Sequence, residues 1–189
     1  MMLSLMYALA VAISSAKDKP PIQYKISVPA PPDFSALDWL QGRWKGKTGP
    51  KSPSGEVQLT VSPDLKRRFL VFRGEVSLAA TSTVPATQES WMGILSAGPD
   101  PRQFDLRTFS SAGFMTRYRL TIDGAEVRLT PEGGDAPPPG WLFRRVWART
   151  GTEEFTETVQ VAPPGKAFFD WYTAKFARVP NSSKTSTAP

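Results

Sequence analysis

The chain has no histidine and no cysteine among its 189 residues. Without cysteine there is no disulfide framework, no thiolate metal site and no residue for lipid attachment after signal-peptide cleavage. Without histidine there is no Ser-His-Asp or Cys-His nucleophile system, and no histidine-ligated zinc or haem. These absences exclude many hydrolase and metalloenzyme classes, and we expect no cofactor.

Long hydrophobic runs are also missing. The main apolar stretch, from Leu3 to Ile13, is shorter than the about 20 residues that span a bilayer. Small residues typical of a signal-peptidase site, Ser14 to Ala16, follow it. We therefore predict a cleaved signal peptide over residues 1–16, export to the periplasm or the extracellular space, and no membrane span after cleavage. An uncleaved or buried N-terminal helix is the alternative.

Clustered charge of one sign is scarce, although the formal net charge is +6. The longest basic run is Lys66-Arg67-Arg68, and Asp64 lies beside it. A basic balance indicates an anionic macromolecule only when the cations cluster. We therefore predict no nucleic-acid partner.

Composition divides the chain into segments. Residues 17–32 hold five prolines and predict an extended linker. Residues 33–179 form the predicted domain. Residues 180–189 are rich in Ser, Thr, Lys and Pro, and we predict that they form a disordered tail.

A short helix is expected at the start of the domain. Ser35 is the predicted N-cap, with Asp38 three residues later and Gly42 as the stop. So short a helix needs packing to be stable, so we expect Leu37 and Leu40 to plug one end of a barrel.

The remainder of the domain consists of short β-rich segments separated by turn signals, of which Asp123-Gly124 is the strongest. The segments are 42–47, 56–62, 68–78, 88–96, 103–109, 114–122, 125–130, 141–149, 153–161 and 167–179. No long helical period interrupts them. This predicts an all-β fold, a single antiparallel up-and-down β-barrel of about ten strands, with a β-sandwich as the alternative.

Side-chain alternation assigns the two faces of several strands. Gly42, Trp44 and Gly46 share one face, opposite a row of cations, and the glycines leave room for the indole ring. Phe72 and Tyr118 are expected to face inward. Glu157 falls on an otherwise apolar face, which predicts a rim position or an ion-pair partner.

Two strands are rich in aromatic residues. In residues 141–149, Arg145 shares a face with Trp141, Phe143 and Trp147. In the last strand, Phe168, Asp170 and Tyr172 are expected on one face and Phe169 and Trp171 on the other.

Three motifs carry a family resemblance: Leu37-Asp38-Trp39-Leu40-x-Gly42-x-Trp44-x-Gly46, the run from Arg68 to Glu75, and the closing Phe176-Ala177-Arg178. Through them the chain resembles the lipocalin-like (calycin) barrels, and among them the nitrobindin-like domains and related bacterial barrels of unknown function. Thr48 stands where nitrobindin-like proteins have a third glycine. Their haem-binding histidine is absent, so no haem role carries over. The resemblance also implies that Arg178 lies over Trp44 and closes the barrel floor by a cation–π contact.

The leading functional hypothesis is non-catalytic binding of a small apolar or amphipathic molecule. A barrel of about ten strands is wide enough for a cavity. We expect Phe72, Tyr118, Trp147 and Tyr172 to line it, with Arg145 holding an acidic headgroup. In the alternative, these rings fill the core and Arg145 points to solvent.

Two other functions are considered. An enzyme would rely on carboxylates within the strands, namely Glu75, Glu89, Asp105, Glu157 and Asp170. No spacing forces any pair to converge, so we assign no catalytic residue. An interaction module would use outward rings of the last strand, Phe169 and Trp171, to form a homodimer or bind a partner.

Overall fold

The computed structural model describes residues 30–49, 52–83, 85–98, 100, 103–134 and 139–180. The predicted signal peptide lies outside these residues, as do residues 17–29 of the predicted linker and residues 181–189 of the predicted tail. Among the described residues, no helix combines the length and apolarity needed to cross a membrane.

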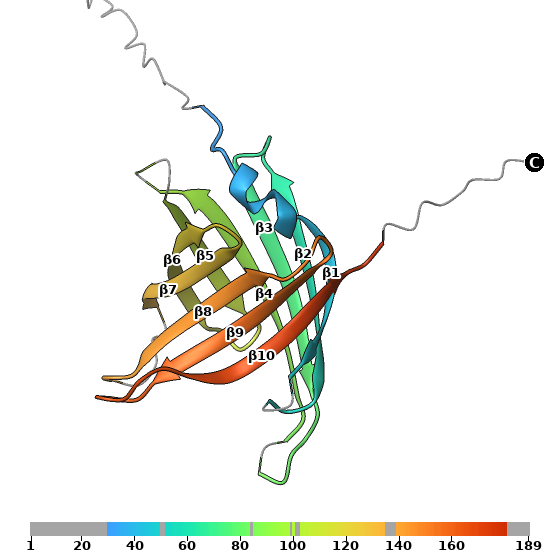
Figure 1. The fold of residues 1–189 in the computed structure, drawn as a ribbon, viewed down its shortest axis with the longest axis vertical. Helices are drawn as coiled ribbons and strands as arrows, with labels where there is room; N and C mark the ends of the chain where they lie inside the picture. The colour runs from blue at the N-terminus through green and yellow to red at the C-terminus, as the bar shows by residue number, and fades with distance from the viewer. Residues whose placement is uncertain are drawn as a thin grey trace, which may run out of the picture. The chain divides into compact units, whose positions relative to one another are not determined.

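Ten antiparallel strands follow one short 3₁₀ helix (Figure 1). The elements are η1 Ser35–Leu40, β1 Gly42–Thr48, β2 Gly55–Asp64, β3 Phe69–Leu78, β4 Thr87–Ala97, β5 Phe104–Ser110, β6 Met115–Asp123, β7 Glu126–Gly134, β8 Leu142–Arg149, β9 Glu154–Ala162 and β10 Phe169–Arg178. Each strand pairs with its neighbours in the chain, and β1 pairs with β10 to close the barrel. The predicted up-and-down barrel is confirmed, and the sandwich alternative is excluded.

The strand that departs furthest from its predicted bounds is β7, which continues past Thr130 to Gly134. Its pairing with β6 shifts there, since Tyr118 lies opposite Pro131 while Arg117 lies opposite Gly133. Glu132 is therefore the extra residue of a β-bulge. A bulge tolerates a proline that a regular ladder would reject, which explains why Pro131 does not end the strand.

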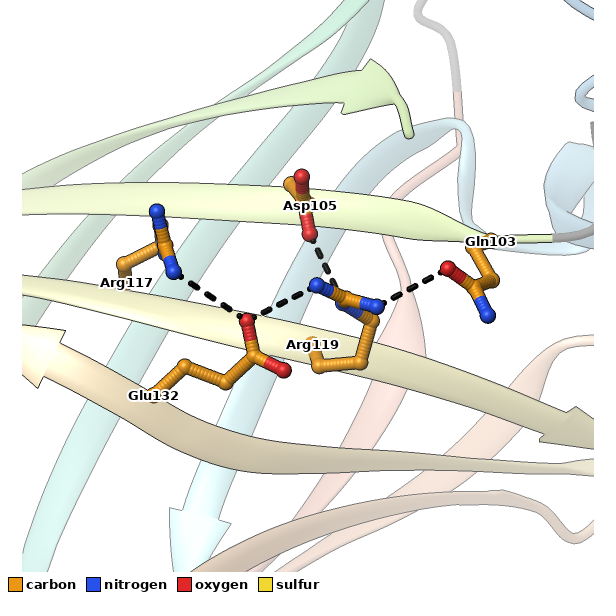
Figure 2. A network of polar contacts seen from close by, with 5 residues as sticks. All are labelled: Gln103, Asp105, Arg117, Arg119 and Glu132. Carbon is orange, nitrogen blue, oxygen red and sulfur yellow. Dashed lines mark hydrogen bonds and ion pairs between the residues drawn. The ribbon is translucent and has the colours of Figure 1, made fainter. Parts of the chain in front are cut away.

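The outer face of β5, β6 and β7 carries a polar network (Figure 2). Arg119 lies 3.0 Å from the Asp105 carboxylate and 2.9 Å from that of Glu132, and it donates to the Gln103 side chain. Arg117 also reaches Glu132, at 3.4 Å. These groups are partly exposed, so the network contributes modestly to stability, and it holds Asp105 outside the barrel.

The helix η1 buries Leu37 and Leu40 within the same core cluster as barrel residues such as Phe155. The prediction that Ser35 caps it was wrong. The residue before the helix is Phe34, which makes no side-chain cap bond, and the Ser35 backbone N–H instead donates to Asp33 Oδ1 at 2.9 Å. Asp33 thus supplies the acceptor that the first turn needs.

The barrel end beside η1 is filled by aromatic rings. Trp44 Nε1–H donates to the Leu40 carbonyl at 2.8 Å, and its ring meets Phe155 edge-on at 4.9 Å. Phe155 stacks on Phe176 at 4.4 Å. A Cβ at Gly46 would lie 2.8 Å from the Phe176 ring, so any side chain at this position would displace the ring. These rings fill the interior of the barrel beside η1, and the hollow of about 600 Å³ that Gly46, Phe155 and Phe176 border also has exposed charged side chains such as Lys45 and Glu154 in its lining.

Arg178 completes the same end. Its Cζ lies 4.2 Å from the Trp44 ring centroid. Its guanidinium donates to the main-chain carbonyls of Gln41 and Trp39 and pairs with Glu153. Because it bonds the chain on both sides of the η1 C-terminus, Arg178 fastens the helix to β10. A Cβ at Gly42, where φ is +124°, would collide with this guanidinium.

Candidate functional site

A cavity of about 280 Å³ lies at the barrel end opposite η1. Its walls come from the strand ends that meet there: the last residues of β3 and β5 and the first residues of β4, β6, β8 and β10. Its lining residues are apolar or aromatic for the greater part, with a few charged groups: Val57, Val76, Leu78, Glu89, Trp91, Thr108, Phe109, Ser110, Phe114, Thr116, Tyr118, Phe143, Arg145, Glu157, Val159, Trp171 and Tyr172. Such a composition is typical of small-molecule sites.

The mouth of this cavity is rimmed by exposed apolar side chains. In the described part of the chain eight large hydrophobic residues are exposed, and all except Leu65 lie at the cavity end. Phe114 and Trp171 line the cavity and are 59% and 61% exposed. An exposed apolar rim of this kind marks a place where a lipophilic molecule or a partner makes contact.

The faces predicted for β10 were wrong at its start. The pairing with β9 shifts between Asp170 and Tyr172, so that Asp170 lies opposite Gln160 but Tyr172 lies opposite Val159. Asp170 therefore accepts a hydrogen bond from the Gln160 side chain at 2.7 Å, away from Tyr172. The extra residue, Trp171, lines the cavity instead of facing outward. A bulge redirects a side chain in this way, and strict alternation does not foresee it.

A buried ion pair lies at the base of the cavity. Glu157, 8% exposed, accepts a hydrogen bond from Trp147 Nε1 at 3.0 Å, and its Oε1 lies 3.3 Å from Arg145 Nε. Of the two positions predicted for Glu157, the structure has the paired one. Arg145 lines the cavity rather than pointing away into solvent, and its Cζ lies 6.0 Å from the Tyr118 ring.

The charged groups of the cavity shift the pKa values of Arg145 and Tyr172. Burial by itself would lower the pKa of Arg145, but the nearby acidic groups, Glu157 foremost and Glu89 among them, raise it above its usual value. Burial, then the charge of Glu157, raises the pKa of Tyr172, and the Arg145 charge opposes this only in part. The acidic neighbours thus stabilise the charged form of Arg145, whereas the pKa of Tyr172 reflects its burial first and the Glu157 charge second.

Two polar atoms of the cavity lack hydrogen-bond partners among the described residues. They are Ser110 Oγ and Arg145 Nε, both buried. Arg145 Nε lies within ion-pair distance of Glu157, but the geometry is not that of a hydrogen bond. Buried polar atoms are almost always bonded in proteins, to other protein groups or to water, so these two atoms can accept or donate a further hydrogen bond within the cavity.

The predicted ligand-binding residues separate into two groups. Tyr118, Arg145 and Tyr172 line the cavity, whereas Phe72 and Trp147 do not. Phe72 and Trp147 stack on each other at 5.5 Å and are fully buried in the core. They support the base of the cavity, because Trp147 holds Glu157.

Sequence reasoning missed Trp91 and Ser110, and it considered Glu89 only as a candidate catalytic group. All three line the cavity. Side-chain alternation along β4 could have placed Glu89 and Trp91 inside the barrel. They share a face with Gly93 and Leu95, which are buried. Among the described residues, no cluster of three or more acidic side chains has the arrangement of a metal site.

A larger hollow of about 580 Å³ lies across β2 to β5. Its charged residues, Arg73 and Glu75, are exposed and lie on the outer face of β3. It contains no buried charged group among its lining residues. We therefore place the candidate site in the cavity inside the barrel.

Comparison with known proteins bears on the fold. No family model and no curated protein sequence matches the chain. Among solved structures, the chain is similar to Rv2717c from M. tuberculosis, with a TM-score of 0.55 and 17% sequence identity. The match covers 77% of this chain and 96% of Rv2717c. At this identity the likeness supports the barrel fold alone.

Proposed function

We propose that the protein is an exported, lipocalin-like barrel of the nitrobindin-related kind that binds a small apolar or amphipathic ligand without catalysis. The observation that carries this proposal is the cavity, with its apolar rim and its buried charged base. Its volume of about 280 Å³ lies just below the range of about 300–1,000 Å³ for drug-sized ligands. The ligand is therefore small.

Haem does not suit this cavity. With no histidine and no cysteine in the chain, the remaining haem ligands are tyrosinate, as in catalase, and methionine. The pKa of Tyr172 is raised by burial and by Glu157, so the phenol keeps its proton. Deprotonation of Tyr172 by a metal would therefore be less favourable than for an ordinary tyrosine, which disfavours this residue as an iron ligand and supports a metal-free ligand.

The positions of the acidic residues support binding rather than catalysis. Asp105 is engaged by Arg119 on the outer face, and Asp170 by Gln160. Glu75 is exposed on the outer face of β3. Glu157 is held by Trp147 and Arg145. These four are engaged or turned away, so none of them is the free group within reach of a substrate that general acid–base catalysis needs. Glu89, the fifth candidate, lines the cavity, and we assign it to ligand binding because no second free carboxylate lies in the cavity among the described residues.

The apolar rim favours a second candidate, a homodimer formed through the mouth of the barrel. Phe169 and Trp171, 48% and 61% exposed, lie on this rim with Leu142. Burial of these side chains would contribute roughly 1.5–3 kcal/mol for each residue. A dimer of this kind would cover the cavity mouth and compete with ligand entry.

The test is a cavity-filling variant, Val76→Trp. Val76 lines the cavity and is partly buried on β3. We expect the wild-type protein to bind an apolar fluorescent probe saturably, at one site, and Val76→Trp to lose about ten-fold or more in affinity, because the indole occupies the ligand's space. The measurement is a fluorescence titration, with the melting temperature checked for each variant.

The matched control is Val71→Trp, which places the same ring on the opposite face of β3. It should bind the probe as the wild type does. Saturable binding that survives Val76→Trp would contradict the proposal. If the probe does not bind and light scattering finds a dimer, the second candidate takes its place.

A further inference from the structure

The charged side chains of the cavity leave one negative charge uncompensated. Glu157 and Arg145 form a pair at 3.3 Å, which accounts for one charge of each sign. Glu89 lines the same cavity, and in the described part of the chain it makes no hydrogen bond or ion pair within the contact limits. Glu89 is partly exposed and adds a second negative charge beside the Arg145–Glu157 pair, so a positive group that enters the cavity is attracted to it.

Two further groups lie beside Glu89. Trp91 is two residues along β4 on the same face, and Ser110 of β5 lies directly opposite Trp91. Glu89 and Ser110 are therefore diagonal neighbours across two strands, which places the two residues roughly 7–8 Å apart, with their Cβ atoms somewhat closer. A hydrogen-bond donor between them reaches both the Glu89 carboxylate and the unpartnered Ser110 Oγ.

The Trp91 ring is held flat against the barrel wall. A Cβ at Gly74, its partner on β3, would lie 2.2 Å from Trp91 Nε1. Glycine at this position therefore lets the indole lie over the strand, with Trp91 still lining the cavity. A cation over an indole face gains about 0.5–2 kcal/mol, more when water is excluded.

We propose that the cavity selects an amphipathic amine, whose ammonium group lies between Glu89 and Ser110 beside Trp91 and whose apolar body extends along the rings of the mouth. This inference rests on the proposed function and names its ligand class. It reverses the charge expected from the sequence, which assigned an acidic headgroup to Arg145. Arg145 is already paired with Glu157, and an acidic headgroup would meet Glu89 as well.

The experiment compares three probes of one chain length, octylamine, octanol and octanoate, by calorimetric titration at neutral pH. We expect the amine to bind about ten-fold more tightly than the alcohol, corresponding to one charge-assisted hydrogen bond, and octanoate to bind most weakly. Glu89→Gln should abolish the preference for the amine and leave octanol binding unchanged. Glu75→Gln, which neutralises an exposed carboxylate on the outer face of β3, is the control and should leave all three affinities unchanged.

Ser110→Ala gives a second variant in case Glu89→Gln fails to fold. It removes an unpartnered hydroxyl, so it should keep or raise the melting temperature while weakening amine binding about three- to ten-fold. Octanol binding with no preference for the amine would overturn this inference and leave the proposed function standing. Binding of none of the three probes would overturn the proposed function itself. An amine preference that survives Glu89→Gln or Ser110→Ala also overturns the assignment of the ammonium site.

Discussion

Both ends of the barrel bury an arginine near aromatic rings, and the two arginines differ in what holds their N–H groups. Arg178 donates to two main-chain carbonyls, pairs with Glu153 and lies over Trp44. Arg145 faces the Glu157 carboxylate, yet its Nε makes no hydrogen bond to any described residue. The Arg178 guanidinium is therefore held by several hydrogen bonds, whereas the Arg145 Nε–H has no hydrogen-bond partner among the described residues.

This difference separates stability from recognition. At the η1 end the rings contact one another and the polar groups bond to the main chain, so a substitution there acts on folding. At the cavity end the rings stand around a space and the polar groups lack partners, so a substitution there acts on binding. Unsatisfied polar atoms reduce stability, and we infer that they are retained at this end for a ligand.

The largest expected effect is that of Phe155→Ala at the η1 end. Phe155 is fully buried between Trp44 and Phe176. Its removal leaves a cavity and should lower the free energy of unfolding by about 3–5 kcal/mol. Urea denaturation measures the loss, and octanol affinity measured under folding conditions should stay at the wild-type value. A loss below about 1 kcal/mol would mean that the aromatic cluster does not hold this end.

The Arg178→Met variant should lower the free energy of unfolding by a smaller amount, about 1–3 kcal/mol. Two main-chain carbonyls lose their hydrogen-bond donors, while methionine keeps the apolar part of the side chain. Arg128→Met is the matched control. Arg128 makes an exposed pair with Glu126, and its loss should cost no more than about 1 kcal/mol. Equal losses for the two variants would remove the distinction between a bonded arginine and a surface one.

The smallest effect concerns the pH dependence of Tyr172. Its folded-state pKa is raised, by burial first and by Glu157 second. Tyrosine in the unfolded chain ionises near about pH 10, so the contribution of Tyr172 to stability is present below that pH and is lost as the pH rises toward the folded-state value. We expect the free energy of unfolding of the wild-type protein to fall above about pH 10. In Tyr172→Phe the same free energy should fall less steeply with pH. Tyrosinate absorbance gives a second readout, and ionisation of Tyr172 at the ordinary pH would contradict the burial of its phenol beside Glu157.

Sequence alone predicted the strands and the inward faces of most of them, because alternation and turn residues are local signals. Trp44 and Phe72 were assigned to the interior in this way and are buried. The helix position was also predicted, although its cap was not, since the helix begins at Ser35 itself and the Ser35 N–H donates to the Asp33 side chain.

The candidate site was less predictable, for two physical reasons. The bulge at Trp171 interrupts the alternation of β10, and nothing in the local pattern marks the residue at which pairing shifts. The approach of Glu89 to Arg145 depends on closing the barrel, which brings β4 and β8 to the same cavity. Such non-local proximity is not encoded in the spacing of the residues along the chain.

The pairing of β7 with β8 has a kinetic consequence. Only four residue pairs join them, from Glu126 with Ala148 to Leu129 with Arg145, and β7 then continues to Gly134 without a β8 partner. Arg145 is thus the last residue of this seam, beside a stretch of ladder that is already open. Segments with few shared hydrogen bonds open at low free-energy cost. We expect amide hydrogens along this seam to exchange sooner than those of the strand pairs with longer ladders, such as β2 with β3, and a molecule to reach Arg145 sideways while the rest of the barrel stays intact.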